Sequence, residues 1–186
     1  GAHFWAQVGH GNAPYVEVET AEAILKAAPK TCLGFVSAED ECPEDLPYFL
    51  EHFVCPVMDI CLRNGAKMFV LVEKGAWWAD TAARPEVRKL LFNGRYRSVL
   101  VPSVEDSNSR SPDLNLAARV GLWLDGQVDR WSCRMVADCF SFNRAHEFEY
   151  PMAGHPLLRT LTAHTALGAS VFMIQAGQRD ERDAER

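Results

Sequence analysis

Several widespread motifs are absent from this sequence, and each absence argues against a class of function. There is no G-x-x-x-x-G-K-[ST] phosphate loop, no G-x-G-x-x-G after an early strand and no G-x-S-x-G elbow, so P-loop, dinucleotide-binding and α/β-hydrolase sites have no support. The His-x-Glu and Pro-Cys-x-x-C signature of zinc deaminases is missing as well. No lysine follows Lys89, which excludes mechanisms that need a lysine in the second half of the chain.

Paired cysteines and long apolar runs are also lacking. The six cysteines show no C-x-x-C spacing, and four of them lie in apolar stretches, where a free thiol behaves as a small buried hydrophobe. We therefore expect reduced cysteines rather than disulfides or a zinc site. No run of eighteen apolar residues and no signal peptide is recognisable. These absences predict a cytoplasmic protein without membrane contact.

Positive charge is scarce. The 19 Lys and Arg residues face 25 Asp and Glu residues, which gives a net charge of −6. A nucleic-acid backbone attracts a positive surface, so we do not expect a nucleic-acid partner. The only basic cluster falls between Arg84 and Arg97, where a solvated helix face and turn explain it.

Three short apolar runs without a helical period predict buried strands, namely Thr31–Ser37, Lys67–Val72 and Arg97–Val101. Helical segments separate them, one of them broken at Pro56 and another opening at Pro85. This β-α-β-α-β order is typical of a parallel sheet with helices on its faces. A short strand at Tyr15–Glu19 is expected to precede it.

The second half of the chain predicts a different arrangement. Asp125-Gly126 supplies the turn of an antiparallel hairpin near 120–135, and His146–Tyr150 reads as a further strand. A closing C-terminal helix is expected from Pro156 to about Gln175. The overall prediction is an α/β fold with a mixed sheet, in which residues 1–177 form one domain and residues 178–186 a charged, frayed tail.

Polar side chains follow the carboxyl ends of the predicted core strands. Ser37, Glu73 and Ser103 occupy such ends, where ligands bind in open α/β sheets. We take these three as ligand-binding candidates, with Glu73 also a candidate catalytic residue. The surface loop Ser103–Asn115 is a further place where function is expected.

A metal site is one interpretation of these strand ends. Glu105 and Asp106 follow the strand after Glu73, and carboxylates at neighbouring strand ends can hold Mg²⁺ or Mn²⁺. The step Val72–Gly75, together with Glu105 and Asp106, resembles a Toprim metal site, which implies metal-dependent chemistry on a phosphate-containing substrate. The alternative interpretation is ordinary loop polarity, with no cofactor.

Two other groups of side chains are candidates. Trp77 and Trp78 follow the Glu73 strand, and at least one of them is expected to face a pocket rim or a partner. His146 and Glu147 could act in acid–base chemistry. Alternation along a strand places these two on opposite faces, however, so an edge strand with one wet face is the competing interpretation.

The order of elements resembles the phospholipase D-like superfamily. The resemblance rests on a helix ending at Arg63–Lys67, the strand Met68–Glu73, the stretch Gly121–Gly126 as a strand ending in aspartate, and a closing segment with Ser141, Asn143 and Glu147. It implies a phosphodiesterase-type fold over most of the chain.

The catalytic motif of that superfamily is degenerate here. Its His-x-Lys pair would fall at Ala117–Val120, which contains neither residue. The resemblance therefore implies lost catalysis, with Ser141, Asn143 and Glu147 as remnants of a phosphate pocket.

The leading hypothesis is a non-catalytic α/β binding or interaction domain that self-associates or binds a protein partner. Trp77, Trp78 and the Ser103–Asn115 loop would form its contact surface. The alternative is a Mg²⁺- or Mn²⁺-dependent enzyme, Toprim-like or phospholipase D-like, acting on a phosphate-containing substrate.

Overall fold

The computed structural model describes residues 1–40, 42, 44–106, 113–135 and 156–174. The first half contains β1 (Phe4–His10), β2 (Ala13–Pro14), α1 (Val18–Ala27), β3 (Cys32–Ala38), α2 (Leu46–Phe49), the π-helix Leu50–Val54, α3 (Cys55–Arg63) and β4 (Met68–Glu73). The rest of the described chain contains α4 (Trp77–Ala83), α5 (Pro85–Leu91), β5 (Leu100–Val104), α6 (Asp113–Leu124), β6 (Ser132–Met135), α8 (Pro156–Ala166) and β7 (Val171–Ile174).

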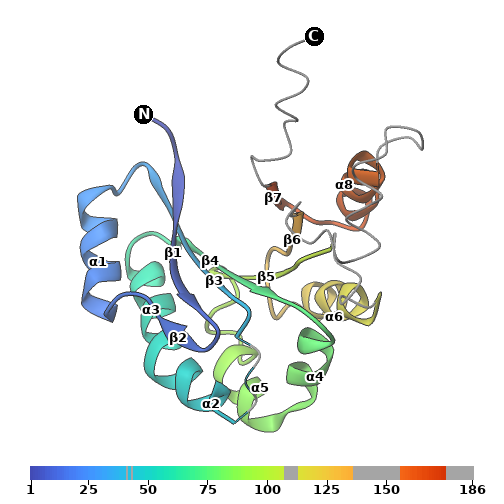
Figure 1. Cartoon of the computed structure of the whole chain (residues 1–186), viewed down its shortest axis with the longest axis horizontal. Coiled ribbons are helices and arrows are strands. Elements are labelled where there is room, and N and C mark those ends of the chain that lie inside the picture. The colour runs from blue at the N-terminus through green and yellow to red at the C-terminus, as the bar shows by residue number, and fades with distance from the viewer. Residues whose placement is uncertain (41, 43, 107–112, 136–155, 175–186) are drawn as a thin grey trace.

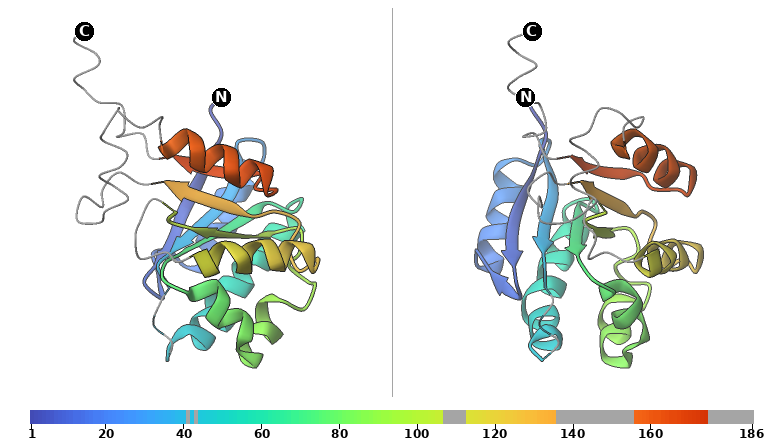
Figure 2. Two further views of the ribbon diagram at one scale, coloured as in Figure 1. Left: turned by 90° about the vertical axis from the view of Figure 1, so that its right-hand side faces the viewer. Right: turned by 45° about the vertical axis from the view of Figure 1, so that its right-hand side comes forward.

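The parallel strands follow one another in chain order. β1, β3, β4 and β5 are parallel neighbours, and β2 is antiparallel to the end of β1. β6 and β7 form a second parallel pair, which an isolated parallel bridge from Glu105 to Arg134 joins to the end of β5. The sheet is curved, and the helices lie around its outer side (Figures 1 and 2). Sequential parallel strands with outer helices are the arrangement of β/α barrels.

Alternating side chains of the strands pack on the two faces of the curve. Phe35, Phe69 and Leu100 are buried in the large cluster that also contains the helices. A smaller cluster of side chains comes from β3, β4, β5 and β7: Val36, Ala38, Val70, Val72, Val101 and Val171. The inside of the curve is therefore packed with aliphatic side chains.

A glycine allows β3 and β4 to pair closely. Gly34 has φ of +140°, and a Cβ atom at this position would lie 1.8 Å from the carbonyl oxygen of Met68. No other residue fits this contact without moving the backbone.

The predicted fold class is confirmed: the structure is mixed α/β, with a mostly parallel sheet, an antiparallel pair and a C-terminal helix. The three predicted core strands are β3, β4 and β5. The prediction of a strand at Tyr15–Glu19 was wrong, because α1 begins at Val18 and the first strand lies earlier, at Phe4–His10.

The predicted hairpin near 120–135 was wrong, since Asp113–Leu124 is helix α6. Asp125-Gly126 ends this helix instead of turning a hairpin. Gly126 has φ of +73°, its N–H donates to the Trp123 carbonyl at 3.0 Å and the Gln127 N–H donates to the Leu122 carbonyl at 2.9 Å. This is a Schellman motif, in which a glycine with positive φ follows the end of the helix. A two-residue hairpin turn also needs positive φ at its glycine, so the Asp-Gly sequence suits both structures.

The antiparallel pair lies at the start of the chain. Gly11 and Asn12, both with positive φ near 60°, connect β1 to β2 in the two-residue turn that hairpins favour. The closing helix is also shorter than predicted: α8 ends at Ala166, Gly168 has φ of +99°, and Val171–Ile174 is strand β7.

Candidate functional site

A row of contacts between basic and acidic side chains crosses the carboxyl ends of five neighbouring strands. His10 ends β1, Glu39 follows β3, Lys74 follows β4, Glu105 follows β5 and Arg134 lies in β6. His10 Nε2 is 3.5 Å from Glu39 Oε1, which is 2.6 Å from Lys74 Nζ. Lys74 Nζ is 3.2 Å from Glu105 Oε2, and Glu105 Oε1 is 3.0 Å from Arg134 Nη1. We call these five residues the charge ladder.

The centre of the charge ladder is buried, with Lys74 and Glu105 side chains only 9% and 4% exposed. Burial alone would lower the pKa of Lys74, but the hydrogen bonds and charges of Glu39 and Glu105 raise it. Burial would likewise raise the pKa of Glu39, yet Lys74 and His10 hold that pKa below its usual value. The charged forms of Lys74 and Glu39 are therefore favoured at neutral pH.

Glu39 reaches the charge ladder through an unusual backbone conformation. Its φ is +59°, a region that residues other than glycine seldom occupy. Its N–H donates to the Val72 carbonyl at 2.8 Å, which holds the chain at the end of β4. Such conformations persist where surrounding contacts fix them, and they concentrate at functional sites.

A second group of hydrogen bonds holds the loop after β3. Asp40 accepts from the Ser37 hydroxyl at 2.7 Å and from the Asn12 N–H at 2.9 Å. Its own N–H donates to Glu73 Oε2 at 3.0 Å, and its carbonyl accepts from Trp77 Nε1 at 2.9 Å. Burial raises the pKa of Asp40 to about 6, against the opposing effect of the bonds from Ser37 and Asn12. Ser37 and Glu73 thus support the loop that carries Glu39.

The two tryptophans are buried, contrary to the prediction that one of them faces a rim or a partner. Their rings pack edge to face with centroids 4.7 Å apart, and Trp78 Nε1 donates to the Ser103 carbonyl at 2.8 Å. The Ser103 hydroxyl bonds to that of Ser132 at 3.1 Å. Trp77 and Trp78 start helix α4, and their hydrogen bonds tie this helix to the loop after β3 and to β5.

Asp106 forms a buried ion pair that sequence reasoning missed. Arg119 of α6, fully buried, donates to both carboxylate oxygens at 2.7 and 2.9 Å and to the Ser132 carbonyl at 2.6 Å. Burial would raise the pKa of Asp106, but His164 and Arg119 lower it. The available signal was the i, i+4 spacing of Asn115 and Arg119, two polar residues that α6 turns to its buried side.

Of the predicted metal ligands, Glu105 and Asp106 face cations, and Glu73 accepts a hydrogen bond from the Asp40 N–H. The Glu105 N–H donates to the Glu73 carbonyl at 3.3 Å, while Glu105 pairs with Lys74 and Arg134, and Asp106 pairs with Arg119. Across the residues that the structure describes, no group of three His, Cys, Asp or Glu side chains is arranged to hold a metal ion. The Mg²⁺ or Mn²⁺ hypothesis therefore has no ligand set in this part of the chain.

Four candidates cannot be placed: Ser141, Asn143, His146 and Glu147 lie outside the described residues, as does most of the Ser103–Asn115 loop beyond Asp106. Within the described ranges no helix is long and apolar enough to cross a bilayer. The cytoplasmic location stays a prediction.

Comparison with known proteins gives the family. A family model described as the lambda-carrageenase middle domain matches residues 1–181. The chain belongs to this family. Lambda-carrageenases from Pseudoalteromonas carrageenovora and from a Pseudoalteromonas species are each 30% identical over 168 residues, which cover 89% of this chain and 17% of each relative. The chain thus spans about a sixth of the length of these relatives. No solved structure matches the chain.

The family assignment corrects the resemblance to the phospholipase D-like superfamily, which was wrong. The resemblance took Gly121–Gly126 as a strand ending in aspartate. In the structure this stretch is the end of α6 and its capping turn. The resemblance therefore extended only to the approximate order of the elements, because the stretch compared with a strand is helical.

Proposed function

We propose that this chain is a non-catalytic interaction domain of a longer carrageenan-degrading enzyme, and that the two edges of its curved sheet join neighbouring segments of that enzyme. The order of the parallel strands carries the proposal, because they follow one another from β1 to β7 around a single curve. In a β/α barrel the same order continues until the last strand pairs with the first. Two further strands would give the usual total of about eight.

The edges of the sheet favour such a junction. In the described part of the chain β7 pairs with β6 on one side only, and β1 meets β2 only at Gly9 and His10. Apolar side chains at these edges are exposed, with Phe4 of β1 40% and Ile174 of β7 50% accessible. Exposed apolar edge strands are templates for pairing with another strand.

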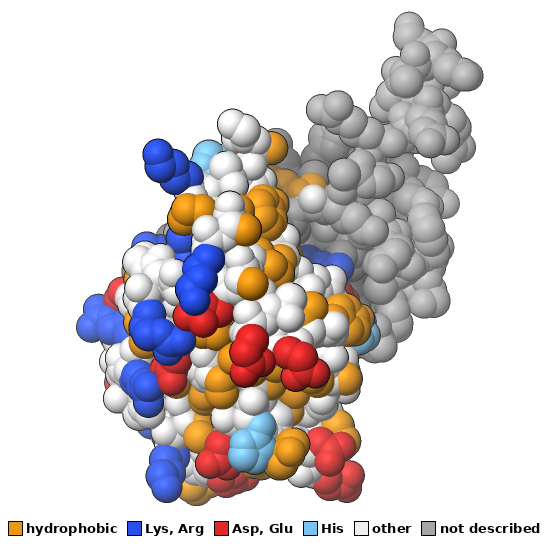
Figure 3. All heavy atoms as spheres, turned by 90° about the vertical axis from the view of Figure 1, so that its left-hand side faces the viewer, with side chains coloured by type: hydrophobic (Ala, Val, Ile, Leu, Met, Phe, Trp, Pro, Cys, Tyr) orange, Lys and Arg blue, Asp and Glu red, His pale blue; other side chains and the backbone are white. Residues whose placement is uncertain are grey.

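The charges at the strand ends support a structural role. The cations of the charge ladder neutralise Glu39 and Glu105, and Arg119 neutralises Asp106. Asp40 accepts two hydrogen bonds and is a further carboxylate engaged inside the fold. On the face that carries α1 and β1, positive and negative side chains both appear (Figure 3), which does not suggest a nucleic-acid partner.

Hydrogen exchange tests the proposed junction. The amides of β7 that point away from β6, every second one along the strand, should exchange at least about 100-fold more slowly in a polypeptide that includes the neighbouring segments than in the 186-residue chain, because only these amides gain a partner. Val70 of β4, paired on both sides, should be equally protected in both. Equal exchange of β7 in the two proteins would contradict the proposal.

A second candidate function is glycosidic cleavage at the charge ladder. Glu39 Oε1 and Glu105 Oε2 lie 2.6 and 3.2 Å from the same Lys74 nitrogen, so these two oxygens are at most about 6 Å apart. Retaining glycosidases hold their two carboxyl groups about 5–5.5 Å apart. The Glu39→Gln variant of the longer enzyme distinguishes the two functions. The interaction proposal expects carrageenan cleavage to change by less than about threefold at a temperature where the variant is folded, whereas removal of a catalytic carboxylate typically costs 10² or more.

A further inference from the structure

Helix α6 carries polar residues on its buried side and apolar residues on its exposed side, the reverse of an ordinary surface helix. Two of its three buried residues are the polar Asn115 and Arg119. After Asp113 its exposed residues are all apolar or glycine, namely Leu114, Ala117, Gly121, Trp123 and Leu124. The exposed residues of α5, by contrast, include Glu86, Arg88 and Lys89. The composition of α6 is therefore that of a helix with another element packed on its outer side.

The exposed apolar surface of α6 continues to the end of α8. α6 lies on the outer side of the sheet, between α4 and α8 (Figures 1 and 2). Leu124 is 73% exposed and Leu114 56%. The Trp123 ring adjoins Gly168, because a Cβ atom on this glycine would lie 2.8 Å from the ring, and the exposed Leu167 precedes Gly168. Contiguous apolar surface of this kind marks an interaction site. We call Leu114, Ala117, Gly121 and Leu124 the α6 face.

Gly121 in the middle of this face is not explained by the described chain. Glycine is among the least favourable residues in a helix interior, and Gly121 lacks the positive φ that would require it. A Cβ atom added to Gly121 would meet no neighbouring element within 4 Å, so packing inside the described fold does not require glycine either. A glycine does allow another backbone to approach closely. The position therefore suits a contact with an element from outside the described residues.

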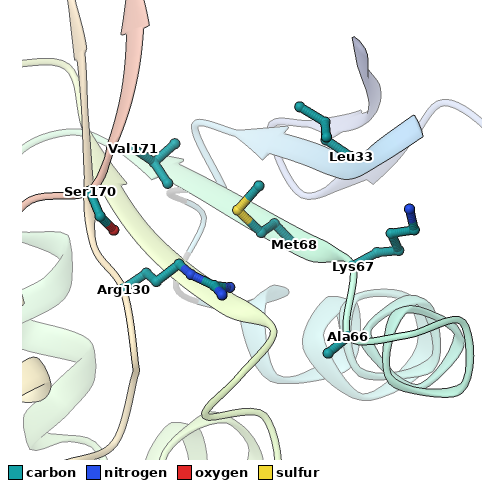
Figure 4. A pocket seen from close by; sticks show the side chains of 7 residues that line it. All are labelled: Leu33, Ala66, Lys67, Met68, Arg130, Ser170 and Val171. Atoms are coloured by element: carbon teal, nitrogen blue, oxygen red, sulfur yellow. The ribbon is translucent and has the colours of Figure 1, made fainter. Parts of the chain in front are cut away.

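A hollow of about 350 Å³ at the start of β4 offers no comparable site. Leu33, Lys67 and Met68 lie on one side of it, and Arg130 and Ser170 on the other (Figure 4). Lys67 turns away from Arg130 (Figure 4) and donates to the Pro29 carbonyl at 2.7 Å. The two cations of this hollow therefore do not converge on one ligand.

We propose that the α6 face packs against a helix from another part of the longer enzyme, with Gly121 at the closest approach of the two backbones. The inference rests on the proposed function, because the 168 matched residues cover only 17% of each relative, so most of such a polypeptide lies outside this chain. The partner helix would place aliphatic side chains between Leu114 and Leu124, at the usual interaxial distance of about 8–10 Å. A second copy of the chain is the competing occupant, which its net charge of −6 disfavours.

Thiol labelling tests which surfaces are covered. Ala117→Cys and Leu124→Cys each place a thiol on the α6 face, and peptide mass spectrometry separates their maleimide labelling from that of the native cysteines. Both thiols should react at least about tenfold more slowly in the longer enzyme than in the 186-residue chain, because opening of the contact must precede the reaction. Lys89→Cys on the charged side of α5 is the matched control and should react equally fast in both proteins.

Three labelling results would overturn the inference: equal rates for the α6 face in the two proteins, equal slowing of Lys89→Cys, or protection in the 186-residue chain that rises with its concentration. The last result would identify a second copy as the occupant. Hydrogen exchange at β7 reports the strand junction separately. Protected β7 amides with rapid labelling of Ala117→Cys would refute the helix contact alone, and unprotected β7 amides with slow labelling would refute the strand junction alone.

Substitutions at Gly121 separate the contact from a role within the chain. In the 186-residue chain Gly121→Ala should raise the Tm by about 2–4 °C, because alanine favours the helix and its Cβ atom meets open space. In the longer enzyme Gly121→Leu should speed the labelling of Leu124→Cys about tenfold, since the added side chain holds the partner helix away. A lower Tm for Gly121→Ala, or unchanged labelling with Gly121→Leu, would contradict the proposed approach at Gly121.

Discussion

Removal of the ammonium group at the centre of the charge ladder should destabilise the fold in a pH-dependent way. Lys74→Met keeps the length of the side chain but leaves Glu39 and Glu105 without the cation that lies 2.6 and 3.2 Å from them. Breaking a buried ion pair from one side costs about 3–5 kcal/mol. We expect a loss in this range at pH 7, which is a large fraction of the roughly 5–15 kcal/mol by which domains are stable.

The pH dependence follows from the pKa of Glu39, which is lowered in the folded protein. A carboxyl with a lowered folded-state pKa contributes stability above its unfolded pKa, and this contribution is lost as the pH falls through the folded pKa. In Lys74→Met this contribution is absent, and the two carboxylates repel each other until one is protonated. The difference between wild type and variant should therefore shrink as the pH falls below the ordinary glutamate pKa of about 4.3.

Urea unfolding followed from about pH 2.5 to pH 8 measures both effects, as the free energy of unfolding obtained by linear extrapolation. Lys26→Met is the matched control, because it removes an exposed ion pair with Glu22 on the surface of α1, and such pairs contribute about 0.3–0.5 kcal/mol. Equal losses in the two variants, or a Lys74→Met loss that does not change with pH, would refute the role given to Lys74.

Four further substitutions test other parts of the structure. Arg119→Leu should lower the free energy of unfolding by about 3–5 kcal/mol in urea titrations, because Asp106 is left buried without its cation; a loss under 1 kcal/mol would contradict the ion pair. Gly34→Ala should prevent folding as judged by circular dichroism, since its Cβ atom would collide with β4, whereas Gly65→Ala meets open space and should cost about 1 kcal/mol for its φ of +87°. The edge of β7 should also permit weak self-association at high concentration, and Ile174→Lys should abolish it in sedimentation; a strict monomer in both proteins would remove this expectation.

The core strands could be predicted from the sequence because strands buried on both faces are continuous apolar runs, as in β3, β4 and β5. The region after β5 could not, because Asp125-Gly126 has the same local chemistry in a hairpin turn and in a helix C-terminus. Only the period of Asn115, Arg119 and Leu122 on the buried side of α6 distinguishes the two. Local turn chemistry was therefore weaker evidence than the helical period.

The position of the carboxylates at one edge of the sheet could be predicted from the sequence, but their ion pairs could not, and a ligand at this edge stays a prediction. Parallel strand ends meet at one edge of a sheet, and Glu73 and Glu105 do lie at neighbouring strand ends. Glu105 is neutralised by Lys74 and Arg134, and these two cations come from separate parts of the sheet, after β4 and in β6. Which charges meet depends on the register of neighbouring strands, and a single sequence does not specify that register.

The central claim is that the sheet curves from β1 to β7 and leaves these two strands unpaired with each other. Pulsed electron paramagnetic resonance between spin labels on β1 and β7 of the 186-residue chain tests it most directly. Adjacent strands lie about 4.8 Å apart, so a gap of two strands predicts backbones about 14 Å apart, with labels separated accordingly. Labels as close as those placed on the paired strands β3 and β4 would show that the sheet closes on itself, and the account of its open edges would be contradicted.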